Sequence, residues 1–120
     1  MKKILIADDH AEVVELVRVT LEGEDYEIVD ASNGKEALKK VRLEKPDLVL
    51  LDVVMPKMDG FEVCRKLKKD PQTKEIPIIM LTAKAQEVEK EKGREVGASD
   101  YITKPFSPSA LLTKIEEILA

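Results

Sequence analysis

The chain has 120 residues, of which 43% are hydrophobic and 37% are charged, and its net charge is -4 at pH 7. This length suits a single domain, and the apolar content excludes a disordered chain. A membrane span is excluded because no apolar run approaches the roughly 20 residues that it requires. The negative charge and an aromatic content of 3% also argue against nucleic acid binding by this chain alone.

The cysteine content and the N-terminus bear on the cellular compartment. The single cysteine, Cys64, cannot form an internal disulfide bond and fits a small apolar residue of a helix. No signal peptide is visible, because the first apolar stretch covers only residues 4–7 before Asp8 and Asp9 interrupt it. We therefore expect a cytoplasmic protein.

Apolar runs and helical stripes alternate along the whole chain. Continuous apolar runs predict strands at residues 4–7, 48–51 and 78–81, and weaker runs predict strands at residues 26–29 and 101–103. Apolar residues at helical spacing, and a charged stretch near the end, predict helices around residues 13–21, 37–41, 61–67, 88–95 and 111–119. No linker or low-complexity tract separates these elements.

Capping residues support these boundaries. Gly23 follows the first predicted helix, where a left-handed cap is common. Asn33 or Ser32 can cap the second helix, and Ser107 can cap the last one with Pro108 at its first position.

The alternation of strands and helices predicts a doubly wound parallel sheet of α/β class with helices on both faces. The first, third and fourth strands are apolar throughout, which is typical of central strands. The second and fifth are mixed, which is typical of edges. A strand order of 2-1-3-4-5 satisfies both conditions.

Polar side chains follow four of the five predicted strands. Asp8 and Asp9 follow the first, Asp52 the third, Thr82 the fourth and Lys104 the fifth. The carboxyl ends of these strands meet in one crevice, where ligands of such sheets bind. Three carboxylates repel one another unless a cation lies among them, and oxygen donors suit Mg²⁺ or Mn²⁺. One carboxylate could then serve as a nucleophile toward a phosphoryl group.

Other roles are open to some of these residues. The pair Asp8 and Asp9 could instead cap the first helix, and Thr82 could cap the helix that follows it. His10 fits a solvated residue at the start of a helix better than a ligand. Met55 and Met58 fit loop packing and a partner surface about equally well.

Four stretches, read together, carry a family resemblance: ILIADDH, LVLLDVVMPKMDGFEV, IIMLTAKA and ASDYITKPFSP. In this order and spacing they resemble the receiver domain of two-component response regulators, the family of the chemotaxis response regulators. The resemblance implies a flavodoxin-like fold of five strand–helix repeats, with residues 1–120 forming one receiver domain.

The resemblance also implies roles for the polar residues. Asp52 would accept a phosphoryl group from a phosphohistidine of a histidine kinase or a phosphotransfer protein. Asp9 would bind Mg²⁺ directly and Asp8 through a water molecule, while the main-chain carbonyl of Val54 completes the coordination. Lys104 would pair with Asp52 and then with the phosphoryl oxygens.

A conformational switch is implied by the same resemblance. Thr82 would turn its hydroxyl to the phosphoryl group and Tyr101 would move inward, and the peptide bond before Pro105 would be cis. A downstream protein would bind the face formed by residues 88–95, 101–103 and 111–119. Such a domain is a signalling switch that turns over no metabolite.

Rival interpretations make different demands on the residues. A degenerate receiver that only docks proteins would lack one of the site residues, and none is missing. A phosphatase on a similar sheet would need a carboxylate at position 54, where Val54 stands.

Val54 and the cationic Lys84 predict slow loss of the phosphoryl group. Gly93 predicts a loosened helix over residues 88–95.

Overall fold

The structure, a computed structural model, describes residues 1–83 and 87–120, and the side chains of all of these except residues 87–90. Strands and helices alternate as predicted. In chain order they are β1 Lys2–Ala7, α1 Ala11–Glu22, β2 Tyr26–Ala31, α2 Gly34–Glu44, β3 Leu48–Asp52, α3 Gly60–Lys69, β4 Ile78–Thr82, α4 Glu87–Glu95, β5 Asp100–Thr103 and α5 Pro108–Leu119.

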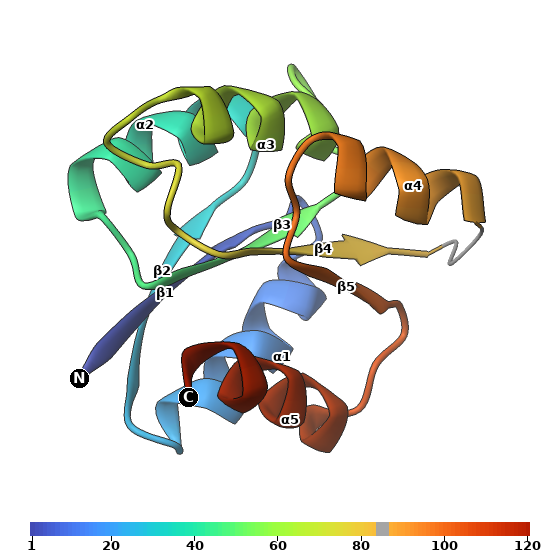
Figure 1. Ribbon diagram of the computed structural model, residues 1–120. Helices are drawn as coiled ribbons and strands as arrows, with labels where there is room; N and C mark the ends of the chain where they lie inside the picture. The colour runs from blue at the N-terminus through green and yellow to red at the C-terminus, as the bar shows by residue number, and fades with distance from the viewer. Residues whose placement is uncertain (84–86) are drawn as a thin grey trace.

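The sheet has the predicted order, β2-β1-β3-β4-β5, and each adjacent pair of strands is parallel. In register, Ile6 of β1 lies beside Leu50 of β3, which in turn lies beside Ile79 of β4. Helices α2, α3 and α4 cover one face of the sheet, and α1 and α5 cover the other (Figure 1). The prediction of a doubly wound α/β fold is confirmed.

Alternate residues of the central strands point to opposite faces, so the sheet separates two hydrophobic clusters. In β1, Leu5 belongs to the cluster under α2, α3 and α4, while Ile4 and Ile6 belong to the cluster over α1 and α5. Every residue of β3 and β4 is buried, whereas the edge strand β2 is mostly half-buried. Burial on both faces explains why the central strands are apolar at every position.

The helix caps follow the predictions in part. The side chain of Asn33 accepts a hydrogen bond from the backbone N–H of Glu36, and that of Ser107 accepts one from Ala110. The prediction for Gly23 is wrong, because this residue has a right-handed backbone with a φ of -66°. The left-handed residue of this turn is Asp25, whose φ is 67°.

The loop between β3 and α3 packs closely against its surroundings. Met55 is buried in the core and Met58 packs against it, so both methionines serve loop packing. A Cβ atom on Gly34 would lie 2.2 Å from the carbonyl oxygen of Met58, and one on Gly60 would lie 2.1 Å from that of Asp52. Glycine at these two positions therefore lets the start of α2 approach this loop and the start of α3 approach the end of β3.

Cys64 is a structural residue of α3. Its side chain is fully buried, and its thiol donates a hydrogen bond to the carbonyl oxygen of Val96. Burial raises the pKa of the Cys64 thiol to about 11, so the thiol stays protonated and unreactive at neutral pH. Among the described residues, no helix is long and apolar enough to span a bilayer.

Candidate functional site

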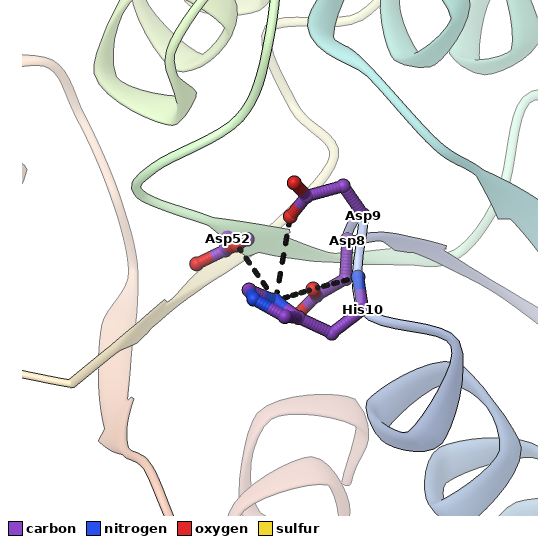
Figure 2. Close-up of side chains that lie close together, drawn as sticks. All are labelled: Asp8, Asp9, His10 and Asp52. Carbon is purple, nitrogen blue, oxygen red and sulfur yellow. Dashed lines mark hydrogen bonds and ion pairs between the residues drawn. The ribbon is translucent and has the colours of Figure 1, made fainter.

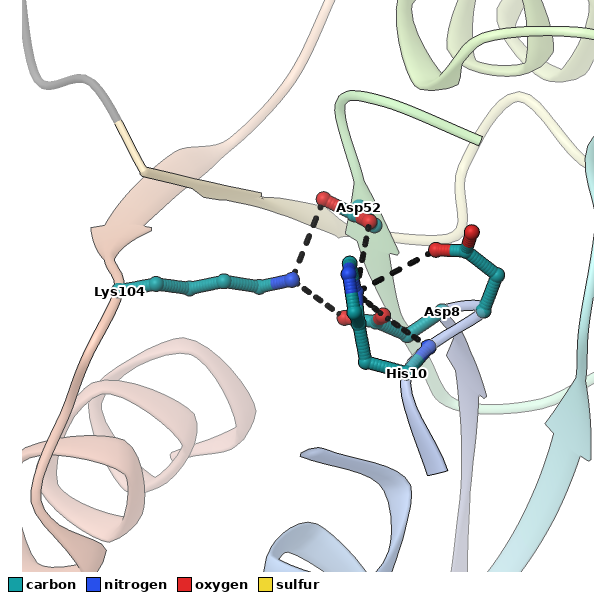
Figure 3. A network of polar contacts seen from close by, with 5 residues as sticks. Asp8, His10, Asp52 and Lys104 are labelled. Carbon is teal, nitrogen blue, oxygen red and sulfur yellow. Dashed lines mark hydrogen bonds and ion pairs between the residues drawn. The ribbon is translucent and has the colours of Figure 1, made fainter. Parts of the chain in front are cut away.

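The carboxyl ends of β1, β3, β4 and β5 border one cleft. This cleft has a volume of about 410 Å³, and Asp52, Thr82 and Lys104 all line it. Asp8 lies beside them, with its carboxylate directed at Lys104 (Figure 3). Thus, the residues that the sequence placed after separate strands lie together, as parallel strands require.

Lys104 bridges two carboxylates at the centre of the site. Its Nζ atom lies 2.7 Å from Oδ2 of Asp8 and 3.3 Å from Oδ1 of Asp52. The exposed fractions of the Asp8, Asp52 and Lys104 side chains are 0%, 6% and 15%. Charges buried to this degree interact strongly, and an unbalanced charge among them is costly.

The surroundings of Asp52 disfavour the ionised form of its carboxyl group. Burial raises the pKa of the Asp52 carboxyl group above its ordinary value, and the charge of Asp8 raises it further. The ammonium group of Lys104 and the backbone N–H of Val54 lower this pKa, but they offset the rise only in part. Oδ2 of Asp52 is buried and has no hydrogen-bond partner in the part of the chain that the structure describes.

His10 is the residue of the site that sequence reasoning missed. It is the N-cap residue of α1, as predicted, but its ring turns toward the carboxylates (Figure 2). Its Nδ1 atom lies 2.9 Å from Oδ1 of Asp8, 3.3 Å from Oδ1 of Asp9 and 4.0 Å from Oδ2 of Asp52. The bond to Asp8 and the charges of Asp8 and Asp9 raise the pKa of His10.

The alternative in which Asp8 and Asp9 cap the first helix is wrong. The helix begins at Ala11 after His10, whose own side chain makes no capping hydrogen bond. Oδ1 of Asp8 instead accepts a hydrogen bond from the backbone N–H of His10 at 2.9 Å. Asp8 is therefore fixed at the end of β1 and pointed inward to Lys104.

Thr82 lies between the charged cleft and a second, mainly apolar cavity of about 150 Å³. Tyr101, Met80 and Gly93 also line this second cavity, which lies beside α4. Thr82 is the last residue of β4, and the described part of α4 starts at Glu87. Residues 84–86 lie outside the described part of the chain, so the role of Thr82 as a cap of the following helix stays a prediction.

Three further residues were predicted at this site. Val54 lines the cleft, and its side chain is largely exposed. The peptide bond between Lys104 and Pro105 is cis. Lys84, to which a screening role was assigned, lies outside the described residues.

The acidic cluster is suited to a divalent cation. Asp8, Asp9, His10 and Asp52 each offer one ligand atom, and these four atoms all lie within 4.8 Å of one another. Three of them are carboxylate oxygens, which are the donors that Mg²⁺ and Mn²⁺ prefer. The buried Oδ2 atom of Asp52 would gain from such an ion the partner that it lacks among the described residues.

A doubly wound sheet with a carboxylate cleft beyond its strand ends defines a class of ligand-binding α/β domains. Within this class, the family model described as "Response regulator receiver domain" matches residues 4–116. The chain therefore belongs to the family of response regulator receiver domains, which act in two-component signalling. This result confirms the resemblance seen in the sequence.

Relatives of known name and structure agree with this assignment. The chain is 50% identical over 118 residues to the alkaline phosphatase synthesis transcriptional regulatory protein PhoP of Bacillus subtilis, covering 98% of this chain and 48% of that protein. It is 49% identical to the phosphate regulon transcriptional regulatory protein PhoB of Pseudomonas aeruginosa, covering 52% of that protein. The chain thus spans about half the length of these curated relatives.

Among solved structures, a chemotaxis response regulator of Vibrio cholerae matches with a TM-score of 0.95 and 37% identity, covering 99% of both chains. The BeF3-activated N-terminal receiver domain of RstA from Klebsiella pneumoniae matches with a TM-score of 0.90 and 36% identity, covering 98% of this chain and 97% of that one. Receiver domains interact with histidine kinases or phosphotransfer proteins and generally bind Mg²⁺. No family of metabolic enzymes is indicated.

Proposed function

We propose that residues 1–120 form one receiver domain, in which Asp52 accepts a phosphoryl group from a phosphohistidine of a kinase or a phosphotransfer protein. The observation that carries this proposal is the state of the Asp52 carboxylate. One oxygen lies 3.3 Å from Lys104, and the other is buried without a hydrogen-bond partner among the described residues. The protein thus leaves this carboxylate only partly paired, and it lines the open cleft, where it can act as the nucleophile.

The residues of the cleft fit Mg²⁺, or Mn²⁺ in its place. Asp9 and Asp52 would hold it directly, Asp8 would act through a bound water molecule, and the main-chain carbonyl of Val54 would contribute a further oxygen. The donor set supports this assignment, because hard oxygens predominate in it. When bound, the ion neutralises negative charge on the carboxylates and on the incoming phosphoryl oxygens.

The transfer step follows from the positions of the remaining groups. One carboxylate oxygen of Asp52 forms a bond to phosphorus while the phosphorus–nitrogen bond of the phosphohistidine breaks, and the bonding electron pair returns to the imidazole nitrogen of the donor. Lys104 then offers its ammonium group to the phosphoryl oxygens, and Thr82 donates its hydroxyl hydrogen. These groups act mainly by position and by electrostatics, as in other phosphoryl transfers.

The signal would leave the site through Thr82 and Tyr101. Thr82 borders both the cleft and the apolar cavity, and Tyr101 borders that cavity from β5. A shift of Thr82 toward the phosphoryl group opens space into which the ring of Tyr101 can move. This movement would alter the face formed by α4, β5 and α5, where we expect a downstream protein to bind.

The rival function, a degenerate receiver that only docks proteins, is disfavoured. Such a domain needs no buried, charged and partly unsatisfied cluster, because that cluster lowers the stability of the fold. Asp8, Asp9, Asp52, Thr82 and Lys104 are all present at the cleft or beside it. A function that uses these charged side chains explains why the cluster is present despite its effect on stability.

Intact-mass measurement tests the proposal. The chain is incubated with acetyl phosphate and Mg²⁺, and a mass gain of roughly 80 Da is expected for one added PO₃ unit. The Asp52→Asn variant and a sample with excess EDTA should show no gain. Asp59→Asn is the matched control, because asparagine preserves the cap that Asp59 provides to α3 and leaves the cleft unchanged. No gain in the unaltered chain, or an equal gain in Asp52→Asn, would contradict the proposal.

A further inference from the structure

We propose that the apolar cavity beside α4 is a binding site for a small aromatic carboxylate, whose ring fills the cavity and whose anionic group pairs with Arg94. The cavity lies where α4 covers the side of the sheet that holds β4 and β5 (Figure 1). It shares Val53 and Thr82 with the charged cleft, but no member of the acidic cluster is among the described residues that line it. Binding of such a ligand needs no phosphoryl transfer, so this site goes beyond the proposed function.

The size and the lining of the cavity suit one aromatic ring. Its volume is about 150 Å³, and an apolar cavity of roughly this volume in an engineered protein accommodates benzene. Val53, Phe61 and Met80 line it from the hydrophobic core, and all three are buried. Aromatic rings pack favourably against the rings of other residues and against methionine sulfur. The cavity therefore favours a planar apolar ring over a polar ligand of the same size.

Gly93 keeps this space open. It is a buried residue of α4 that lines the cavity. A Cβ atom at position 93 would lie 3.9 Å from Met80 and Ala98, which is an ordinary contact. The surroundings therefore do not require glycine here, unlike at Gly34 and Gly60, where a Cβ atom would collide with backbone oxygens. Glycine weakens the interior of a helix, and the need for an open cavity accounts for its presence in α4.

Arg94 supplies a positive charge to this site. It lines the cavity as an exposed residue, and its guanidinium group has no hydrogen bond or ion pair with another described residue. The lining also includes Asp100, but both of its carboxylate oxygens are engaged: Oδ1 accepts a hydrogen bond from the backbone N–H of Tyr101 at 2.8 Å, and Oδ2 lies 3.0 Å from Nζ of Lys114. Arg94 is therefore available to a carboxylate, which a guanidinium group can bind through two parallel hydrogen bonds.

A ligand in this cavity would oppose the proposed switch, and this consequence rests on the proposed function. The inward movement of the Tyr101 ring would need the space that the ring of the ligand occupies, since Tyr101 also lines the cavity. Ligand binding and phosphorylation of Asp52 would then weaken each other by the same factor, because coupling between two binding sites is reciprocal. The ligand would thus favour the unphosphorylated form of the chain.

Titration of the full chain with sodium benzoate, followed by the NMR chemical shifts of the backbone amides, tests the site. We expect a dissociation constant on the order of 1 mM, which suits a ligand of one ring, with the largest shifts at Gly93, Ala98 and Ser99 of the cavity lining. Benzyl alcohol carries the ring without the charge, and it should bind about fivefold more weakly because it lacks the pair with the exposed Arg94. Acetate carries the charge without the ring and should leave these signals unchanged.

Variants of the lining separate the two parts of the ligand. Arg94→Gln should lower the affinity for benzoate about fivefold and leave that for benzyl alcohol unchanged. Arg65→Gln is the matched control, because Arg65 is an exposed arginine of α3 that does not line the cavity. Gly93→Leu should fill the cavity and abolish the binding of both ligands. Gly93→Ala should weaken their binding, and it serves as the test if leucine at this position prevents folding.

Three results would overturn the proposal: amide shifts confined to residues outside the cavity, equal benzoate affinity in Arg94→Gln and the unaltered chain, or equal affinity in the folded Gly93 variant. After labelling with acetyl phosphate and Mg²⁺, shown by the gain in mass, benzoate affinity should fall at least about fivefold. Unchanged affinity of the labelled chain would overturn the competition with Tyr101. Absence of the mass gain would instead contradict the proposed function, while benzoate binding to the unlabelled chain would still support the site.

Discussion

The two ends of the parallel sheet both carry a lysine surrounded by carboxylates, but the two lysines differ in burial. At the amino end, Lys3 lies 2.9 Å from Glu44 and 3.9 Å from Glu27, and all three side chains are at least one-quarter exposed. At the carboxyl end, Lys104 lies 2.7 Å from Asp8 and 3.3 Å from Asp52, and these side chains are almost entirely buried.

This difference separates charge that solvent screens from charge that the fold buries. Solvent screens the ion pairs at the amino end, so these pairs contribute little to stability. Water can also solvate the charged groups of these side chains. At the carboxyl end, burial raises the pKa of Asp52, and one of its oxygens is unsatisfied within the described residues. The fold therefore gives up stability at one end of the sheet, which a bound cation and a phosphoryl group would restore.

The largest effect is expected where α3 meets the carboxyl end. In Gly60→Ala the new Cβ atom would lie 2.1 Å from the backbone oxygen of Asp52, so the backbone must shift and the free energy of unfolding should fall by about 3 kcal/mol or more. Gly23→Ala is the control, because its Cβ would lie 3.7 Å from the nearest atom. Urea denaturation of both variants measures the difference. Equal stability of the two variants would contradict the close packing of Gly60 against the backbone of Asp52.

Removal of each lysine compares the two ends directly. Lys104→Met leaves Asp8 and Asp52 buried without their ammonium partner, so we expect a loss of about 2–3 kcal/mol. Mg²⁺ should recover part of this loss. Lys3→Met should leave the melting temperature unchanged within error, because its partners are solvated. Similar losses in both variants would remove the distinction between the ends.

Neutralisation of Asp52 should stabilise the fold. In the absence of divalent ions, we expect Asp52→Asn to raise the free energy of unfolding by on the order of 1 kcal/mol, because Lys104 keeps its contact with Asp8. This corresponds to a rise of about 4 °C in melting temperature. Addition of Mg²⁺ should stabilise the unaltered chain and have no such effect on the variant. A lower free energy of unfolding in the variant would contradict the view that the charged carboxylate of Asp52 destabilises the fold.

The gain from Asp52→Asn should depend on pH in a defined direction. The folded chain holds the Asp52 proton more tightly than the unfolded chain, because burial and Asp8 raise the pKa of this group above 3.8. The contribution of Asp52 to stability therefore falls as the pH rises from 3.8 through the folded-state pKa. The advantage of the variant should accordingly widen across this range, which thermal denaturation at a series of pH values measures. A constant difference would show that the pKa of Asp52 is unchanged by folding.

The smallest effect concerns α4, beside the carboxyl end. In Gly93→Ala the added Cβ would meet Met80 and Ala98 at 3.9 Å, an ordinary contact, so helix propensity should raise stability by about 0.5–1 kcal/mol. Hydrogen exchange over residues 85–96 should slow. Unchanged exchange would remove the hypothesis that Gly93 loosens this helix for switching.

The sequence predicted the sheet and most of the site for identifiable reasons. Strands such as β3 are buried on both faces, and a run of apolar residues records this directly. Asp8, Asp52 and Lys104 lie at the carboxyl ends of separate strands, and the parallel topology brings them together without any local signal in the sequence. Pattern and topology are therefore sufficient to place residues whose location depends on the backbone alone.

The errors concern features that depend on side-chain direction or on single turns. The ring contacts of His10 depend on its rotamer, and nothing in the sequence indicates that its ring faces the carboxylates. Gly23 was assigned the left-handed position, whereas the turn places Asp25 there.

The most direct test of the central claim locates the phosphoryl group within the chain. After incubation with acetyl phosphate and Mg²⁺, borohydride reduction converts an aspartyl phosphate to homoserine, which peptide mass spectrometry can locate. The account predicts conversion at Asp52 alone, lost when EDTA is present. Conversion at Asp8, Asp9 or Asp59, or no conversion at any aspartate, would contradict it.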